Sequence, residues 1–320
     1  MLCSWSGEEY GLLGSTAWGE LNAAQPLLQR ALAYLNVDVG VSGDQFQASG
    51  TPTLGQVLAG ALGQVNDPKR GVPLSELWDD GDLMALGSGS DYTVFIDHLG
   101  IPSLDMSFSP GSAYGVYHST FDSFEWMESE GDPGFLYHQA MARVWGLVAL
   151  RLAGHEADAP AVVPLNYTLQ AEAIKGYISD ARARPNASAH LDFSKLDAAH
   201  SLFATAAARA MVEVAALAKE PSSPSRSARV AALNDRFAAV ERRFLMAEGL
   251  PGRKWFRHCL QAPGLYTGYA PKTLPGVYDA TTTEDWDVAQ AQADRAAQHI
   301  AAAASALNEP VAHAVAMDDM

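Results

Sequence analysis

Short apolar runs alternate with helical stretches over the first 154 positions of this 320-residue chain, and this alternation most constrains its fold. The runs predict strands at 2–5, 33–37 and 101–108. The stretches between and after them predict helices at 6–22, 53–65, 91–99 and 132–152. Such a rhythm is typical of an α/β fold with an open, mainly parallel sheet and flanking helices. The sheet begins midway, so we expect the chain to lack strands at its front.

The pattern changes after Gly154, where the strand signals stop. A linker rich in Ala, Asp and Pro is expected at 155–164. Helices are expected at about 165–184, 195–219, 227–248 and 287–307. The segment 249–285 is long and irregular, and such loops are usually functional or packed on something. We therefore predict an incomplete α/β domain at 1–156, followed by an all-α four-helix domain at 157–320.

Charge and composition exclude several kinds of partner. The chain has 21 Lys and Arg against 37 Asp and Glu, a net charge of −16, which disfavours nucleic acid and anionic membranes. The most apolar helix candidate, 198–219, is interrupted by charged residues, so no membrane segment is expected. Cys3 and Cys259 form neither a disulfide framework nor a zinc-finger spacing. Sequons at Asn166 and Asn186 would permit glycosylation in a secretory protein.

Acidic and imidazole side chains follow the predicted strands. Glu8 and Glu9 come after the first run, Asp38 after the second and His118 in the loop after the third. Because ligands bind at the carboxyl ends of strands in open α/β sheets, we expect these residues to converge. Adjacent glutamates suit a metal hydrolase, since one can bind the metal while its neighbour takes a proton from the bound water. His and carboxylate groups are ordinary zinc ligands.

Each of these positions also has a purely structural explanation. Ser6 and Glu9 have the spacing of a helix capping box, and Glu8 would then favour the helix dipole. Asp38 fits a turn. His118 taken alone supports neither interpretation. The residues together favour a metal site, whereas each alone leaves the alternative open.

Several motifs resemble one known family. Residues 4–16 (SWSGEEYGLLGST) resemble the glutamate-pair motif of the glutamate carboxypeptidase II and transferrin receptor family. Further similar motifs in the first half are YLNVD at 34–38, GSGSDY at 87–92 and YHSTFDS at 117–123. The second half resembles the family's dimerisation domain through LPGR at 250–253, FRH at 256–258 and LPGVYDA at 274–280. The resemblance runs nearly from end to end.

The resemblance implies a role for individual residues. Glu8 would be the general base, Glu9 and His118 would bind the catalytic zinc, and Asp38 would bind a second zinc. The remaining implied residues contact substrate: Tyr117 through a hydrogen bond to the tetrahedral intermediate, Gly89 through its carbonyl, Ser90 beside it, and Tyr269 at the terminal carboxylate. A complete member would hold two zinc ions per site, act on peptides and form a homodimer through the helical domain.

The chain also departs from the family pattern. The family's further His ligand, its bridging Asp and its protease-associated domain would all lie upstream of the first predicted strand. The family's paired arginines near the substrate fall at Asp105 and Ser107, and its pocket lysine falls at Gly268. Substrates are therefore expected to be non-acidic. A calcium site near the first helix keeps Glu20, but its partner position is Ala17.

These observations predict a zinc-dependent exopeptidase of the secretory pathway, vacuole or exterior, present here as a truncated piece without turnover of its own. The alternative is a non-catalytic dimeric receptor-like or scaffold module of the same family. The Ala-rich stretches at 203–217 and 289–305 are the expected dimer contacts.

Overall fold

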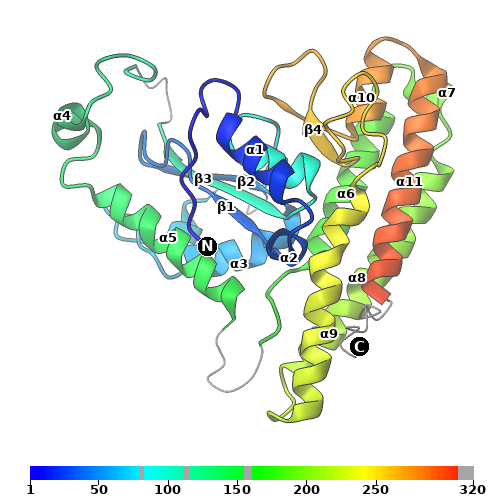
Figure 1. Cartoon of the computed structure of the whole chain (residues 1–320), viewed down its shortest axis with the longest axis horizontal. Coiled ribbons are helices and arrows are strands. Elements are labelled where there is room, and N and C mark those ends of the chain that lie inside the picture. The colour runs from blue at the N-terminus through cyan, green and yellow to red at the C-terminus, as the bar shows by residue number, and fades with distance from the viewer. Residues whose placement is uncertain (79–82, 111–114, 155–160, 309–320) are drawn as a thin grey trace, which may run out of the picture.

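The computed structural model describes residues 1–78, 83–110, 115–154 and 161–308 (Figure 1). Its first half contains a three-stranded sheet in the order β1–β3–β2. Strand β1 (Tyr34–Asn36) runs parallel to β3 (Ser103–Ser109), whereas β2 (Gln45–Gly50) runs antiparallel to β3 at the edge. The fold is therefore α/β as predicted, but its small sheet is mixed rather than mainly parallel.

Strands β1 and β3 confirm the predictions at 33–37 and 101–108, whereas the strand predicted at 2–5 is wrong and β2 was not predicted. Strand β2 was missed because its sequence, QFQASG, is short and half polar. Residues 2–5 form no strand with any described part of the chain. Instead the Trp5 indole donates a hydrogen bond to the Tyr34 hydroxyl (2.9 Å) and packs against Trp18 and Phe95. Aromatic packing, not strand pairing, therefore holds this segment.

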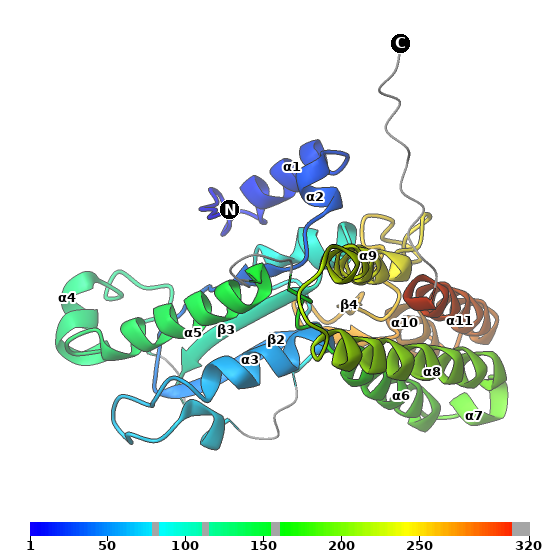
Figure 2. The same cartoon turned by 90° about the horizontal axis from the view of Figure 1, so that it is seen from below.

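The two faces of the sheet differ because side chains alternate along a strand. Leu104, Met106 and Phe108 of β3 join the main core with α3 (Gly55–Leu62) and α5 (Leu136–Ala153). The opposite face presents Asn36, which lies opposite Asp105 in the β1–β3 register. The helix α1 (Leu13–Asn22) lies on this second side (Figures 1 and 2), together with a π-helix over Val94–His98. There the Tyr34 and Phe95 rings stack with their centroids 3.9 Å apart.

The second half is mostly helical. Its helices are α6 (Tyr167–Ala183), α7 (Ala187–His190), α8 (Ser194–Leu217), α9 (Pro224–Val240), α10 (Pro275–Thr282) and α11 (Trp286–Asn308). The long helices lie where helices were predicted. The half is not all-α, however, because β4 (Gln261–Pro263) and β5 (Pro271–Thr273) form an antiparallel pair within the supposed irregular segment. Two short helices, α2 (Pro26–Gln29) and α4 (Phe124–Trp126), complete the first half.

Helices α8 and α11 lie side by side in Figure 1 and contact each other, and both bury alanines. Ala206, Ala207 and Ala210 of α8 are buried, and so are Ala293 and Ala297 of α11. Small side chains allow close helix packing. These buried alanines therefore belong to the chain's own core, and a dimer contact through the helical half stays a prediction.

Two other expectations concern the ends of the halves and the membrane. The predicted boundary at 156/157 and most of the linker at 155–164 lie outside the described residues. Throughout the described ranges, no helix combines the length and apolar character needed to cross a membrane.

Candidate functional site

A cavity of about 480 Å³ brings together residues from both halves of the chain. From the first half it is lined by the predicted site residues Glu8, Glu9, Asp38, Gly89, Tyr117 and His118. From the second half it is lined by Trp255, Phe256 and Tyr269. The predicted convergence of Glu8, Glu9, Asp38 and His118 on one space is therefore observed, although Glu8 and Glu9 follow no described strand.

The paired glutamates lie in consecutive turns before α1. The Gly11 and Leu12 amides donate to the Glu8 carbonyl at 2.9 and 2.8 Å, and the Gly14 amide donates to the Ser6 carbonyl at 2.9 Å. Helix α1 begins only at Leu13, and its N-cap residue, Leu12, has a left-handed φ of 57° with no side-chain cap. The capping-box interpretation of Ser6 and Glu9 is therefore wrong, because the helix starts several residues later.

Glu9 and His118 meet directly across the cavity. The His118 Nε2 atom lies 3.0 Å from Glu9 Oε1, and both side chains are more than half exposed. His118 has a left-handed φ of 57°, a conformation that is uncommon for non-glycine residues and recurs at functional sites. The ring of Tyr117 stacks on the imidazole at 3.9 Å. The loop thus presents Tyr117 and His118 together.

Asp38 is held by a chain of hydrogen bonds that leads into the sheet. The Ser90 hydroxyl donates to Asp38 Oδ2 at 2.6 Å, and the Asn36 amide nitrogen donates to Ser90 Oγ and to Asp105 Oδ1, each at 2.9 Å. Ser90 is almost fully buried. Its hydroxyl therefore orients the Asp38 carboxylate, and the substrate contact that the resemblance implied for Ser90 stays a prediction.

Carboxylates are crowded around this site, and their pKa values reflect it. Burial, then the charges of Asp38, Glu9 and Asp91, raises the pKa of Glu8. Burial also raises the pKa of Asp91, whose buried Oδ1 has no hydrogen-bond partner among the described residues. Burial raises the pKa of Asp105 to about 6, although the Asn36 hydrogen bond acts in the opposite direction. Such a concentration of negative charge suits a site that receives a dication.

The residues present fit part of a zinc site. Zinc binds His nitrogen and carboxylate oxygen at about 2.0–2.2 Å, so donor atoms as close as those of Glu9 and His118 can share one ion. Over the residues that the structure describes, no three His, Cys, Asp or Glu side chains are grouped to hold a metal. A catalytic zinc normally keeps three protein ligands. The described residues thus place one close pair of imidazole and carboxylate groups in the cavity, which is fewer than the three ligands of a catalytic zinc.

The second half also lines the cavity, and of its three lining residues only Tyr269 was predicted. The Ser88 amide donates to the Tyr269 carbonyl at 3.2 Å, which seats the β4–β5 loop on the loop before the π-helix. Trp255 and Phe256, which were not predicted, line the same cavity. The sequence indicated these two residues only indirectly, through the expectation that the long segment 249–285 is functional or packed on another part of the protein. Glu20, which the resemblance placed near a calcium site, instead accepts a hydrogen bond from Trp255 Nε1 at 2.6 Å.

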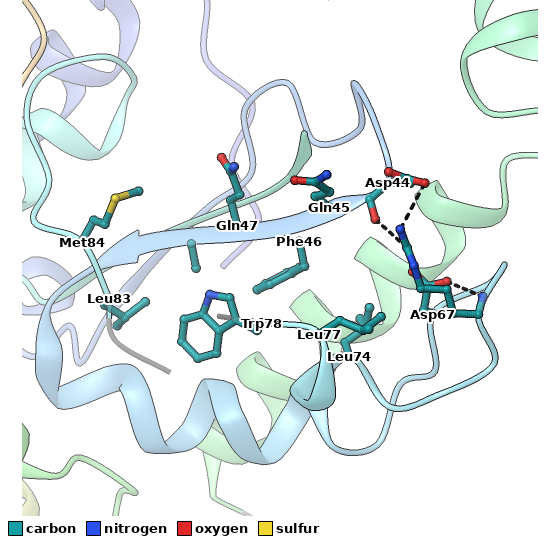
Figure 3. A pocket seen from close by; sticks show the side chains of 12 residues that line it. Asp44, Gln45, Phe46, Gln47, Asp67, Leu74, Leu77, Trp78, Leu83 and Met84 are labelled. Atoms are coloured by element: carbon teal, nitrogen blue, oxygen red, sulfur yellow. Dashed lines mark hydrogen bonds and ion pairs between the residues drawn. The ribbon is translucent and has the colours of Figure 1, made fainter. Parts of the chain in front are cut away.

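A second cavity of about 530 Å³ lies under β2 (Figure 3). Phe46, Trp78 and Leu77 form its apolar part. At its charged end, Arg70 lies 3.0 Å from Asp67 and 3.6 Å from Asp44. These charges pair with one another, and the cavity shares no lining residue with the first. The site of interest is therefore the smaller cavity.

Comparisons with known proteins agree with this geometry. Residues 1–132 match peptidase family M28, and residues 191–308 match the transferrin receptor-like dimerisation domain. The chain belongs to the glutamate carboxypeptidase and transferrin receptor family. It is 39% identical to the probable glutamate carboxypeptidase LAMP1 of Arabidopsis thaliana, over 94% of this chain and 44% of the relative.

Other family members show similar coverage. A probable glutamate carboxypeptidase of Arthroderma benhamiae is 37% identical over 96% of this chain and 42% of its own length. The aminopeptidase NAALADL1 of Rattus norvegicus is 32% identical over 88% of this chain and 39% of its own length. The chain therefore spans about two fifths of the length of these relatives.

Proposed function

We propose that this chain is part of a zinc-dependent exopeptidase that hydrolyses terminal peptide bonds. The observation behind this proposal is the meeting of Glu9 and His118 at 3.0 Å in a cavity that Glu8 and Asp38 also line. The match of residues 1–132 to peptidase family M28 supports the proposal. The proposed zinc ligands are Glu9 and His118 for the catalytic ion and Asp38 for a second ion.

Glu8 is the proposed general base. Burial and the neighbouring carboxylates raise its pKa, which makes it a stronger base than an ordinary carboxylate. When bound, zinc would supply the acidification of a water molecule. The Tyr117 hydroxyl would donate a hydrogen bond to the oxygen on which negative charge develops. The Gly89 carbonyl would accept from the substrate amide, and Tyr269 would contact the terminal carboxylate.

The proposed substrates are peptides with a neutral or apolar terminal residue. Asp105 lies on the polar face of the sheet opposite Asn36, and Ser107 lies two positions further along the same strand. Gly268 lies in the β4–β5 loop, next to Tyr269. No lysine or arginine lines the cavity among the described residues. An anionic side chain placed there would be desolvated without a counter-charge, which is costly.

The alternative is a non-catalytic module, and the incomplete ligand set of the described residues favours it. A chimera separates the two: the part of LAMP1 upstream of the matched region, joined to this chain. We expect the chimera to hydrolyse dipeptides with apolar ends, and Glu8→Gln to abolish this. The chain alone is expected to bind zinc weakly and to show no turnover. Stoichiometric zinc without hydrolysis by the chimera would favour the module.

We further propose the domains 1–156 and 157–320, with the second acting as a four-helix homodimerisation domain. The match at 191–308 supports this assignment. A secretory, vacuolar or extracellular location is part of the same proposal. Of the two sequons, Asn186 is the better acceptor because its side chain is exposed. The Asn166 amide instead donates to Gln56 and accepts from Thr168.

A further inference from the structure

The lining of the cavity combines two chemically different groups of residues. The first half contributes the carboxylates and His118. The second half contributes the adjacent aromatic residues Trp255 and Phe256. Leu12 and Val39 add aliphatic surface to the same lining. The aromatic pair therefore extends the site beyond the residues that would hold metal.

Trp255 is fixed in place by residues of the first half. Its indole nitrogen donates to Glu20 Oε1 at 2.6 Å. Its ring stacks on the imidazole of His98 at a centroid distance of 4.8 Å, and its carbonyl oxygen lies 2.9 Å from His98 Nδ1. Three contacts from α1 and the π-helix thus hold one residue of the second half. A side chain held in this way loses little freedom when a ligand binds.

Phe256 is also held firmly, both through its backbone and through its ring. Its amide donates to the Arg253 carbonyl at 3.0 Å, and its carbonyl accepts from the Leu250 amide at 2.8 Å. Its ring meets that of Trp255 edge-on at 5.1 Å, and the Arg253 guanidinium lies 5.6 Å from its centroid. Both aromatic residues stay partly exposed although each packs against a buried cluster. Partly exposed, well-fixed aromatic rings in a concave site commonly serve as ligand contacts.

We propose that Trp255 and Phe256 form an apolar subsite that binds an apolar side chain of the peptide. This inference rests on the proposed function, since it identifies part of the substrate of the same cavity. An aromatic or branched aliphatic side chain would bury apolar surface against both rings. An acidic side chain would find no cation among the described lining residues. The subsite therefore selects substrates by apolar contact.

Dipeptide binding to the full chain tests the subsite. Isothermal titration calorimetry, with zinc present, would compare Gly-Phe, Gly-Ala, Gly-Glu and Gly-Lys. We expect Gly-Phe to bind about tenfold more tightly than Gly-Ala and Gly-Glu. Phe256→Ala should reduce the Gly-Phe to Gly-Ala ratio to near one. The matched control is Tyr266→Ala, which removes a 74% exposed aromatic ring of the neighbouring loop and should leave the ratio unchanged.

Two further measurements keep the outcome interpretable. Phe256→Leu retains apolar volume and the packing of the core, so it should lower the Gly-Phe to Gly-Ala affinity ratio only in part. Thermal unfolding of each variant checks that the chain stays folded. Trp255→Phe removes the hydrogen bond to Glu20 and should lower the ratio more than Glu20→Gln does, because the glutamine oxygen can still accept.

The possible results separate the subsite from the peptidase proposal. Gly-Phe binding that depends on Phe256 supports the subsite even when the chimera hydrolyses nothing. Equal ratios in the wild type and Phe256→Ala overturn the subsite even when the chimera is an active peptidase. A preference for Gly-Lys or Gly-Glu that Phe256→Ala leaves unchanged also overturns it, because charge would then direct binding.

Discussion

The Nε2 atom of His118 lies 3.0 Å from Glu9 Oε1, although 109 positions separate the two residues. We therefore expect His118→Ala and Glu9→Ala each to weaken zinc binding by at least about tenfold, because each removes one of two ligands. Competition with a fluorescent zinc chelator measures the affinity. His190→Ala, an exposed histidine in α7, is the control and should bind zinc like the wild type. Unchanged affinity in both site variants would place the metal elsewhere.

Asp105 should make the protein less stable as pH rises. Its folded pKa of about 6 lies above its ordinary value of 3.8, so the folded state binds this proton more tightly than the unfolded state. The contribution is full below about pH 4 and is lost as pH rises towards 6. Asparagine does not titrate in this range, so the Asp105→Asn variant does not lose stability in this way as pH rises. Its stability relative to wild type should therefore increase over that window, by up to roughly 3 kcal/mol. Urea unfolding at pH 4, 5, 6 and 7 measures it.

Asp132 provides a comparison of opposite sign. Burial alone would raise its pKa, but hydrogen bonds from His138 and the Tyr137 amide outweigh burial, so its pKa is lowered. Its carboxylate therefore stabilises the fold above the ordinary pKa and ceases to do so as pH falls. Asp132→Asn should cost more stability at pH 7 than at pH 3. If the stabilities of the Asp132→Asn and Asp105→Asn variants, each relative to wild type, changed with pH in the same direction, the local surroundings of the two carboxyls would not explain the pH dependence.

Gly87 allows the second half to reach the site. A Cβ added there would overlap the carbonyl oxygen of Tyr269, which itself accepts from the Ser88 amide. Gly87→Ala should therefore displace the β4–β5 loop and destabilise the chain by about 1–3 kcal/mol. Hydrogen exchange over residues 264–270 should become faster. At Gly176 in α6 an added Cβ meets nothing within 4 Å, so Gly176→Ala should be neutral or stabilising by up to about 1 kcal/mol.

A homodimer would need a surface other than the buried Ala faces. The outer side of α8 exposes Leu202 (59%) and Val212 (69%), which are available to a partner. We expect the double variant Leu202→Glu/Val212→Glu to be monomeric by light scattering at concentrations where the wild type is a dimer. Leu150→Glu on α5 is the matched control, since Leu150 is also 59% exposed. A wild-type monomer at high micromolar concentration would refute the homodimer.

The local periodicity of the sequence sufficed for the long helices and for β1 and β3. Apolar spacing in α5, α6, α8 and α11 is strong enough to indicate helices without knowledge of their partners. It failed for β2, because QFQASG becomes a strand only by pairing with β3. It failed also for residues 2–5, whose apolar character is satisfied by packing against α1 and the π-helix.

Some residues of the candidate site could be predicted from the sequence, and others could not. Residue type together with the family resemblance indicated Glu8, Glu9, Asp38 and His118, because carboxylates and imidazole have chemistry that a short motif can display. The roles of Ser90, Trp255 and Phe256 depend on what lies beside each side chain. Ser90 orients Asp38 only because Asn36 and β3 lie next to it. Trp255 reaches the cavity only because Glu20 and His98, from distant segments, hold it there. Sequence alone determined which groups could react, whereas long-range packing, which no local pattern encodes, decided what surrounds them.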